Sequence, residues 1–169
     1  IAANGSYSYV ANQAAADALD AGDIVTDSFN YTVSDGTATD TAVITITVIG
    51  INDTPTAQND VGVIVEDGTL TVANSANATL TGTYDATGEN SGDLIDTSSS
   101  SHTDSDSDAS ASLSITQIKK SGGSNSAVGI GSSYNSSGTQ VTGTYGTLTI
   151  GADGSYTYAA TQDAADVLD

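Results

Sequence analysis

A segment of twenty residues occurs twice in this chain, 149 positions apart (150 minus 1). Residues 1–20 read IAANGSYSYVANQAAADALD and residues 150–169 read IGADGSYTYAATQDAADVLD, so 13 of 20 positions are identical without a gap. The match keeps glycines, tyrosines and leucines in register, which composition bias alone does not produce. Repetition at a fixed period is the signature of repeat architectures. We therefore expect one repeat period followed by the start of the next.

Several short stretches alternate hydrophobic and polar residues, which is the pattern of half-buried β-strands. Two of them cover residues 29–33 and 42–48, with the turn pair Asp35-Gly36 between them. Further alternations occur at 61–65, 70–72, 113–115 and 148–150. Short strands at this spacing are typical of all-β sandwiches.

The repeated segment itself predicts a hairpin and a short helix. The pairs Asn4-Gly5 and Asp153-Gly154 are strong hairpin-turn signals. Residues 13–19 are rich in alanine, and we expect Asn12 to cap this helix at its start. The stretches 86–112 and 121–143 are rich in serine, glycine and asparagine, and we expect loops there.

The chain is strongly acidic, with 21 Asp and Glu against two basic residues and a formal net charge of −19. Such a charge opposes a compact state and is typical of disorder, but the ordered alternations argue for a folded chain. The balance excludes a nucleic-acid partner, which needs a basic patch, and no apolar run is long enough for membrane insertion. Because cysteine is absent, no disulfide can stabilise the fold. We therefore expect a bound metal ion to stabilise it instead.

Two segments, residues 20–57 and 141–169, resemble the VCBS repeats of giant RTX-type surface adhesins of bacteria. The carrying sequences run from DAGDIVTDSFNYTV to GINDTPTA and from VTGTYGTLTI to DAADVLD, about half of the chain. The resemblance implies a cadherin- or immunoglobulin-like Greek-key β-sandwich in tandem repeats. It also implies Ca²⁺ at the repeat junctions and a place outside the cell, on the bacterial surface or in a secreted fibre.

This resemblance divides the chain at a junction. Residues 1–49 would be the C-terminal half of one repeat, 50–57 the inter-repeat linker, and 58–169 the N-terminal part of the next repeat. We expect the chain to be a window onto a longer polypeptide, with 150–169 superposing on 1–20.

The resemblance also names ligands. A cadherin-like junction ends with Asn-Asp before Pro, which Asn52, Asp53 and Pro55 match, whereas Gly50 stands where the family has an Asp. Family acids further resemble Asp20, Asp23, Glu66, Asp104 and Asp106.

The residues themselves favour calcium, which takes six to eight oxygen ligands from adaptable loops. The run Asp104-Ser-Asp106-Ser-Asp108 would place three carboxylates on one side of an extended backbone. The alternative is a solvated acidic loop. Asp35 and Asp40 bracket a turn, either as ligands or as turn formers only. The full set of candidate Ca²⁺ ligands is Asp20, Asp23, Asp35, Asp40, Asn52, Asp53, Asp60, Glu66, Asp104, Asp106 and Asp108.

We expect no enzyme, because the only histidine, His102, lies in a serine-rich stretch without Cys or Arg. The favoured function is a structural extender repeat of a calcium-stiffened adhesin. Its partners would be neighbouring identical repeats in the same or adjacent chains. The alternatives are a carbohydrate- or ligand-binding module, which would hold Tyr rings in an open cleft, and a fibre subunit assembled by strand complementation.

Overall fold

The computed structural model describes residues 1–74, 79–81, 92–95 and 102–165. These residues form antiparallel sheets and a single four-residue helix, so the prediction of an all-β chain is confirmed at that level. They divide into two compact units. The first unit comprises Ile1–Pro55 and Asp106–Ala111, and the second comprises Thr56–Ser105 and Ser112–Asp169. No helix among the described residues has the length and apolar character that crossing a membrane requires.

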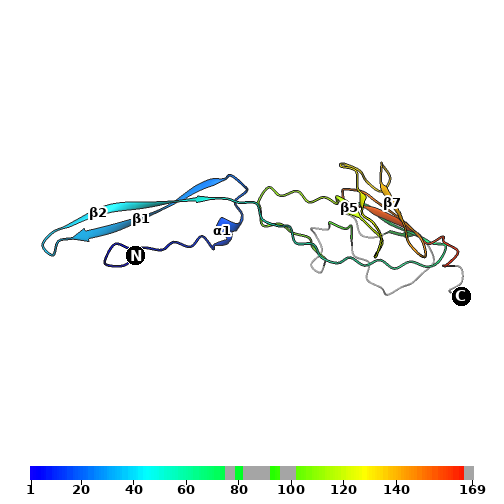
Figure 1. The fold of residues 1–169 in the computed structure, drawn as a ribbon, viewed down its shortest axis with the longest axis horizontal. Helices are drawn as coiled ribbons and strands as arrows, with labels where there is room; N and C mark the ends of the chain where they lie inside the picture. Colours follow the sequence, from blue (N-terminus) through cyan, green and yellow to red (C-terminus); the bar gives the residue numbers. More distant parts are fainter. Residues whose placement is uncertain (75–78, 82–91, 96–101, 166–169) are drawn as a thin grey trace. The chain divides into compact units, whose positions relative to one another are not determined.

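The first unit is built on one long β-hairpin. Strand β1 (Ile24–Ser34) pairs with strand β2 (Thr39–Ile49) over eleven residues, from Ile24 opposite Ile49 to Ser34 opposite Thr39. Figure 1 shows the two strands side by side along their length. Gly36 takes φ +89° in the turn between them, as the Asp-Gly pair predicts.

The hairpin has one apolar and one polar face, because directly opposite residues of an antiparallel pair share a face. Ser28 lies opposite Thr45 on the polar face, where their hydroxyl oxygens are 3.3 Å apart. The apolar face carries Val25, Phe29, Tyr31, Val33, Ala42, Ile44, Ile46 and Val48. Much of it is exposed, including Phe29 at 48% and Val33 at 58%. A two-stranded ribbon with an uncovered apolar face is only marginally stable.

Residues 1–20 run beside this hairpin and end in helix α1 (Ala14–Asp17) (Figure 1). Gln13, and not Asn12, is the residue that precedes the helix, and its side chain makes no capping hydrogen bond. The prediction of an Asn12 cap is therefore wrong. Residues 1–13 contain no strand, although the Asn4-Gly5 turn forms with Gly5 at φ +82°.

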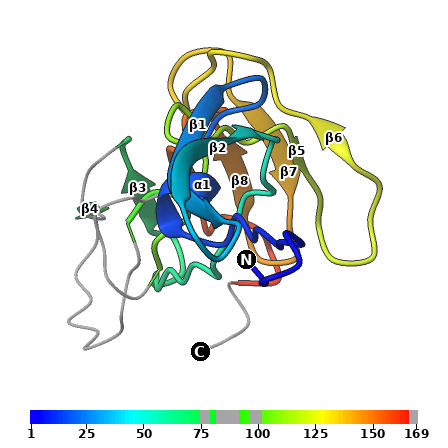
Figure 2. The same cartoon turned by 90° about the vertical axis from the view of Figure 1, so that its left-hand side faces the viewer.

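The second unit contains a five-stranded antiparallel sheet in the order β4-β3-β9-β8-β7. Its strands are β3 (Thr69–Val72), β4 (Thr79–Thr81), β7 (Thr139–Thr142), β8 (Thr147–Ile150) and β9 (Tyr156–Ala159). A separate ribbon pairs β5 (Gln117–Ile118) with β6 (Ser126–Ala127). Figure 2 shows β7 and β8 side by side in this unit.

The core of the second unit lies on this sheet. Ile150 and Val72 are fully buried and lie opposite Tyr156 on the two neighbouring strands. The buried cluster consists of Leu70, Val72, Val128, Ile150, Ala152 and Tyr156. Leu148 and Tyr158 pack against its edge. The predicted strands at 70–72 and 148–150 and the turn at Asp153-Gly154 are thus confirmed.

Two predicted strands are wrong. Residues 61–65 and 113–115 make no ladder, although Ile64 and Ile115 pack against the core. The N–H of Ile115 donates to the Ala152 carbonyl at 2.9 Å, which is a single loop contact. The apolar residues of these two segments are therefore explained by burial against the core and not by strand pairing. The predicted loop over 121–143 contains β6 and β7, and much of the loop predicted over 86–112 lies outside the described residues.

The two copies of the repeated segment adopt the same turn. In the first, Asn4 Oδ1 accepts the backbone N–H of Ser6 at 3.1 Å and also its hydroxyl. In the second, Asp153 Oδ1 accepts the N–H of Ser155 at 3.1 Å and also its hydroxyl. These are equivalent positions, 149 residues apart, so the side-chain geometry is repeated along with the sequence.

One backbone turn recurs as well, at the start of helix α1 and at the equivalent turn of residues 163–165. The N–H of Ala16 donates to the Gln13 carbonyl at 2.7 Å, and the N–H of Ala165 donates to the Gln162 carbonyl at 2.7 Å. The expectation that 150–169 adopts the structure of 1–20 thus holds for these turns, whereas residues 156–159 form β9 and residues 7–10 form no strand. Residues 166–169 lie outside the described residues.

Candidate functional site

Four candidate calcium ligands of the first unit, Asp20, Asp53, Asp106 and Asp108, take part in the hydrogen bonds of residues 106–111. The N–H of Ser110 donates to Asp20 Oδ1 at 3.0 Å, across 90 positions of sequence. The N–H of Asp53 donates to Asp108 Oδ2 at 3.0 Å, across 55 positions. The carboxylate of Asp20 therefore binds the backbone at Ser110, and the carboxylate of Asp108 binds the backbone of the predicted linker at Asp53.

Asp106 and Asp108 form a local pair. The N–H of Asp108 donates to Asp106 Oδ1 at 2.9 Å, which is the geometry of an Asx turn. Asp108 Oδ1 is buried and has no hydrogen-bond donor. A buried carboxylate oxygen without a partner is costly, and a cation would remove that cost. Among the candidate ligands of the first unit, this oxygen is the one that is buried without a donor.

Asp20 is the second carboxylate of this region. Its hydrogen bonds from Ser110 hold the pKa of the Asp20 carboxyl below its usual value, so Asp20 is charged at neutral pH. Asp23 Oδ2 accepts the N–H of Asp20 at 3.2 Å, and this short loop brings both acids together.

Gly50 stands where the resemblance to cadherin-like junctions led us to expect an Asp. A side chain at this position would collide with the carbonyl oxygen of Asp20 and would come within 2.8 Å of that of Leu19. The N–H of Gly50 donates to the Asp23 carbonyl at 2.9 Å, and the N–H of Gly22 donates to that of Gly50 at 3.2 Å. The position therefore serves backbone packing, and it has no room for any side chain.

The Asp-Ser-Asp-Ser-Asp run is shared between the units. Asp104 belongs to the second unit, whereas Asp106 and Asp108 belong to the first. Asp104 is 8% exposed, and its Oδ1 accepts the N–H of Gln58 at 2.7 Å. A two-way backbone bridge between Thr56 and Ser105 continues this contact. Each Asp of the run thus organises a different piece of backbone.

Asp60 and Glu66 lie half-buried in the second unit. Burial raises the pKa of Tyr156 to about 12, and the negative charge of Asp60 adds to the shift. Asp60 is therefore close to the core. Asn52 donates its side-chain amide to the Asp53 carbonyl in the first unit and is exposed. The structure thus does not place Asn52, Asp53, Asp60 and Glu66 in one unit.

Asp35 and Asp40 act on the backbone of the hairpin. Asp35 Oδ1 accepts the N–H groups of Thr37 at 2.8 Å and Ala38 at 2.7 Å, which lowers the pKa of its carboxyl. Asp40 Oδ1 accepts the N–H of Thr41 at 2.8 Å. Of the two readings of the sequence, this geometry favours turn formers.

No three Asp, Glu or His side chains within the described ranges converge closely enough to hold a metal ion. The carboxylates of the first unit occur as pairs, Asp20 with Asp23 and Asp106 with Asp108. A calcium site there would have to be completed by backbone carbonyls, water or movement of a carboxylate, as flexible calcium loops permit.

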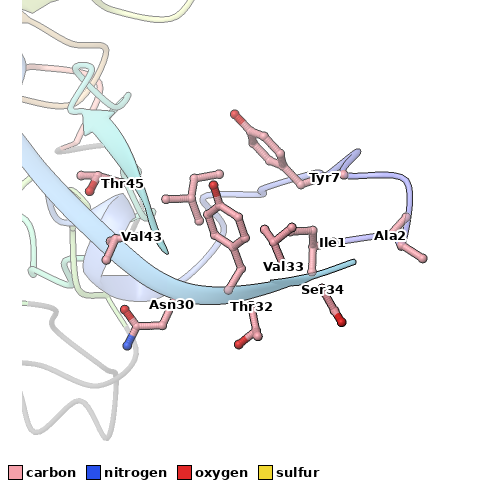
Figure 3. A pocket seen from close by; sticks show the side chains of 13 residues that line it. Ile1, Ala2, Tyr7, Asn30, Thr32, Val33, Ser34, Val43 and Thr45 are labelled. Carbon is pink, nitrogen blue, oxygen red and sulfur yellow. The ribbon is translucent and has the colours of Figure 1, made fainter. Parts of the chain in front are cut away.

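The first unit also contains an aromatic groove that the sequence did not predict as a site. The groove, about 960 Å³ in volume, lies between residues 1–7 and the hairpin, with Tyr7, Tyr31 and Val43 among its lining residues. Figure 3 shows Val33 on the side facing the segment that carries Tyr7, and Asn30 on the opposite side of β1.

A second hollow of the first unit is lined by Tyr9 and Phe29 among other residues. The Tyr9 hydroxyl donates to Asp27 Oδ2, and the Tyr9 ring centroid lies 6.3 Å from that of Phe29. The hydrogen bond raises the pKa of the Tyr9 hydroxyl. Asp27 is an acidic residue on the otherwise apolar face of β1. Its position in the alternation was the one sequence feature that could have predicted a polar contact there.

No protein-family model matches the chain, and neither a curated protein nor a solved structure matches it.

Proposed function

We propose that this chain is part of an extender repeat in a long, calcium-stiffened bacterial surface protein that acts outside the cell and has no enzymatic activity. Each repeat would be a Greek-key sandwich of the VCBS and cadherin-like type, and the array would supply reach and stiffness. The partners are neighbouring repeats of the same kind and Ca²⁺.

The observation that carries this proposal is the structural repetition. The turn at Asn4–Ser6 recurs at Asp153–Ser155 with the same side-chain acceptor and a 3.1 Å bond in both copies. Repetition of both sequence and side-chain geometry supports an array in which one unit follows another.

The polar contacts around residues 106–111 support a role for calcium at the junction. They join Asp20, Asp106 and Asp108 in one unit with Asp53, which belongs to the predicted linker. The net charge of −19 has no disulfide to oppose it. A divalent cation at Asp108 would neutralise the buried oxygen and hold these loops together.

Thermal unfolding of the full chain in calcium and in chelator tests the metal. A ligand that binds only the folded state stabilises it by about 2.7 kcal/mol per site at a hundredfold excess over Kd. We expect a higher midpoint in calcium than in chelator at equal ionic strength. Equal midpoints would remove calcium from the proposal.

A carbohydrate- or ligand-binding module is the second candidate, and the aromatic groove is the observation that favours it. Tyr7 and Tyr31 line the groove, and a second hollow is lined by these two rings and by Phe29, as in sites that stack sugar rings. Titration with soluble oligosaccharides, followed by tyrosine fluorescence, tests it. Saturable binding that Tyr31→Ala abolishes would favour this candidate over the extender.

A further inference from the structure

The most informative contrast in the molecule lies between equivalent residues of the two repeated segments. Ile150 is 0% exposed and Tyr156 is 6% exposed, whereas the equivalent Ile1 is 78% and Tyr7 is 59% exposed. Because the turn bonds are the same in both copies, local conformation does not cause this difference. Its cause is that other residues cover the second copy.

The second unit shows what covers it. Strand β9, which contains Tyr156, lies between β3 and β8 in the five-stranded sheet. Val72 and Ile150 lie opposite Tyr156, while Leu70 and Leu148 lie opposite Tyr158. In the first unit, residues 7–10 are extended without any strand pairing. They repeat β9 without its two neighbours.

The uncovered surface extends from this segment onto the hairpin. The open face, as we name it, consists of Ile1, Tyr7, Tyr9, Phe29, Tyr31 and Ile44. An apolar sheet face is stable in water only when a second layer covers it. The opposite face of the hairpin carries hydroxyl residues such as Ser28 and Thr45 and needs no cover.

We propose that the open face is the uncovered core half of a repeat, and that its occupant is a second copy of the segment 56–149, joined directly before residue 1. This inference rests on the proposed tandem-repeat function. The occupant's β3 would pair with residues 7–10 on one side, placing its Val72 opposite Tyr7. Its β8 would pair on the other side, placing its Leu148 opposite Tyr9. The sheet thus completed would lie on the apolar face of the hairpin and close a sandwich.

The register of the repeat selects this occupant. In the second unit β8 runs directly into the turn that precedes β9, so an equivalent strand must run directly into residue 1. A separate copy of the chain would have to release its own β9 from β3 and β8 before it offered the same site. The open face therefore fits the β3 and β8 strands of a preceding repeat. A sugar bound there would occupy the space that these strands would fill.

A fusion tests this directly. Residues 56–149 are placed before residue 1 of the full 169-residue chain, and amide hydrogen exchange is followed in peptides covering 5–11 and 25–33, in calcium and in chelator. We expect exchange in both peptides to slow by roughly tenfold or more relative to the 169-residue chain, because new strand pairs and burial protect amides. The effect should appear in chelator too, which separates this inference from the failure of calcium binding.

Two variants of the fusion complete the test. Ile44→Asp places a charge on the open face and should abolish the added protection of residues 25–33. Thr47→Asp places the same charge on the hydroxyl face and should leave it intact. Unchanged exchange in the unsubstituted fusion would overturn the proposal. Protection that appears in the 169-residue chain as its concentration rises, together with larger species in sedimentation, would also overturn it in favour of exchange between separate copies.

Discussion

Val72 lies opposite Tyr156 across the β3–β9 pair, and both side chains are buried in the core of the second unit. Burial and the charge of Asp60 raise the pKa of Tyr156 to about 12. A raised pKa in the folded state means that ionisation disfavours folding. The stability that the neutral ring contributes is fully present below pH 10, the ordinary value, and is lost as the pH rises through 12.

We therefore expect the free energy of unfolding to fall steeply between pH 10 and pH 12, and Tyr156→Phe to make this fall shallower. Denaturant titrations at a series of pH values measure it. Tyr7→Phe is the matched control, because it changes the equivalent residue of the first copy, whose ring is 59% exposed. Identical pH profiles for Tyr156→Phe and the unsubstituted chain would contradict the account.

Asp108 should distinguish calcium binding from simple charge repulsion. Its Oδ1 is buried without a hydrogen-bond donor, so Asp108→Asn removes an unfavourable buried charge in chelator and a ligand in calcium. We expect the melting midpoint in chelator to stay or rise, while the increase that calcium produces shrinks. Asp40→Asn, an exposed acid of β2, serves as the control and should retain the full calcium increment. An undiminished increment in Asp108→Asn would remove this residue from the site.

Asp35 should behave as a turn former. Its carboxylate accepts the N–H groups of Thr37 and Ala38, which lowers its pKa below the ordinary 3.8. A lowered pKa gives stability that is present above pH 3.8 and lost as the pH falls through the folded-state value. We expect Asp35→Ala to speed amide exchange at residues 34–39, and Asp35→Asn to restore protection without the acid dependence. A smaller calcium increment in Asp35→Asn would instead make Asp35 a ligand.

Gly50 should tolerate no side chain. A Cβ there would collide with the Asp20 carbonyl oxygen, so we expect Gly50→Ala to cost about 1–3 kcal/mol, as overpacking typically does. Chemical denaturation measures this cost. Gly129→Ala is the control, since a Cβ at Gly129 meets nothing within 4 Å and its backbone does not have positive φ. Equal stabilities of the two variants would contradict the packing argument.

The sequence correctly predicted strands where alternation of apolar residues and a turn-forming pair occur together. Residues 29–33 and 42–48 alternate around an Asp-Gly turn, and they form the hairpin. Residues 61–65 alternate equally well but form no ladder, because pairing depends on a neighbouring strand that local sequence does not specify.

The sequence predicted which residue types make up the candidate site, but it did not predict how they are arranged in space. The alternate spacing of Asp104, Asp106 and Asp108 suggests one site with three carboxylates. In the structure, Asp106 and Asp108 belong to the first unit, whereas Asp104 belongs to the second. Their partners, such as Ser110 for Asp20, are set by contacts across 90 residues. The aromatic groove was missed because alternation predicts a covered face, and nothing in local sequence says that the covering layer comes from elsewhere.

The central claim of the proposal is that calcium stiffens the predicted linker over residues 50–57, and a distance distribution across that linker measures its stiffness directly. The chain has no cysteine, so Thr32→Cys in the first unit and Ile130→Cys in the second, both exposed, give a specifically spin-labelled pair. Pulsed electron resonance then reports the spread of the label-to-label distance. We predict a narrow distribution in calcium, a broad one in chelator, and a broad one in both conditions for Asp53→Ala. Equal widths in calcium and in chelator would contradict the account.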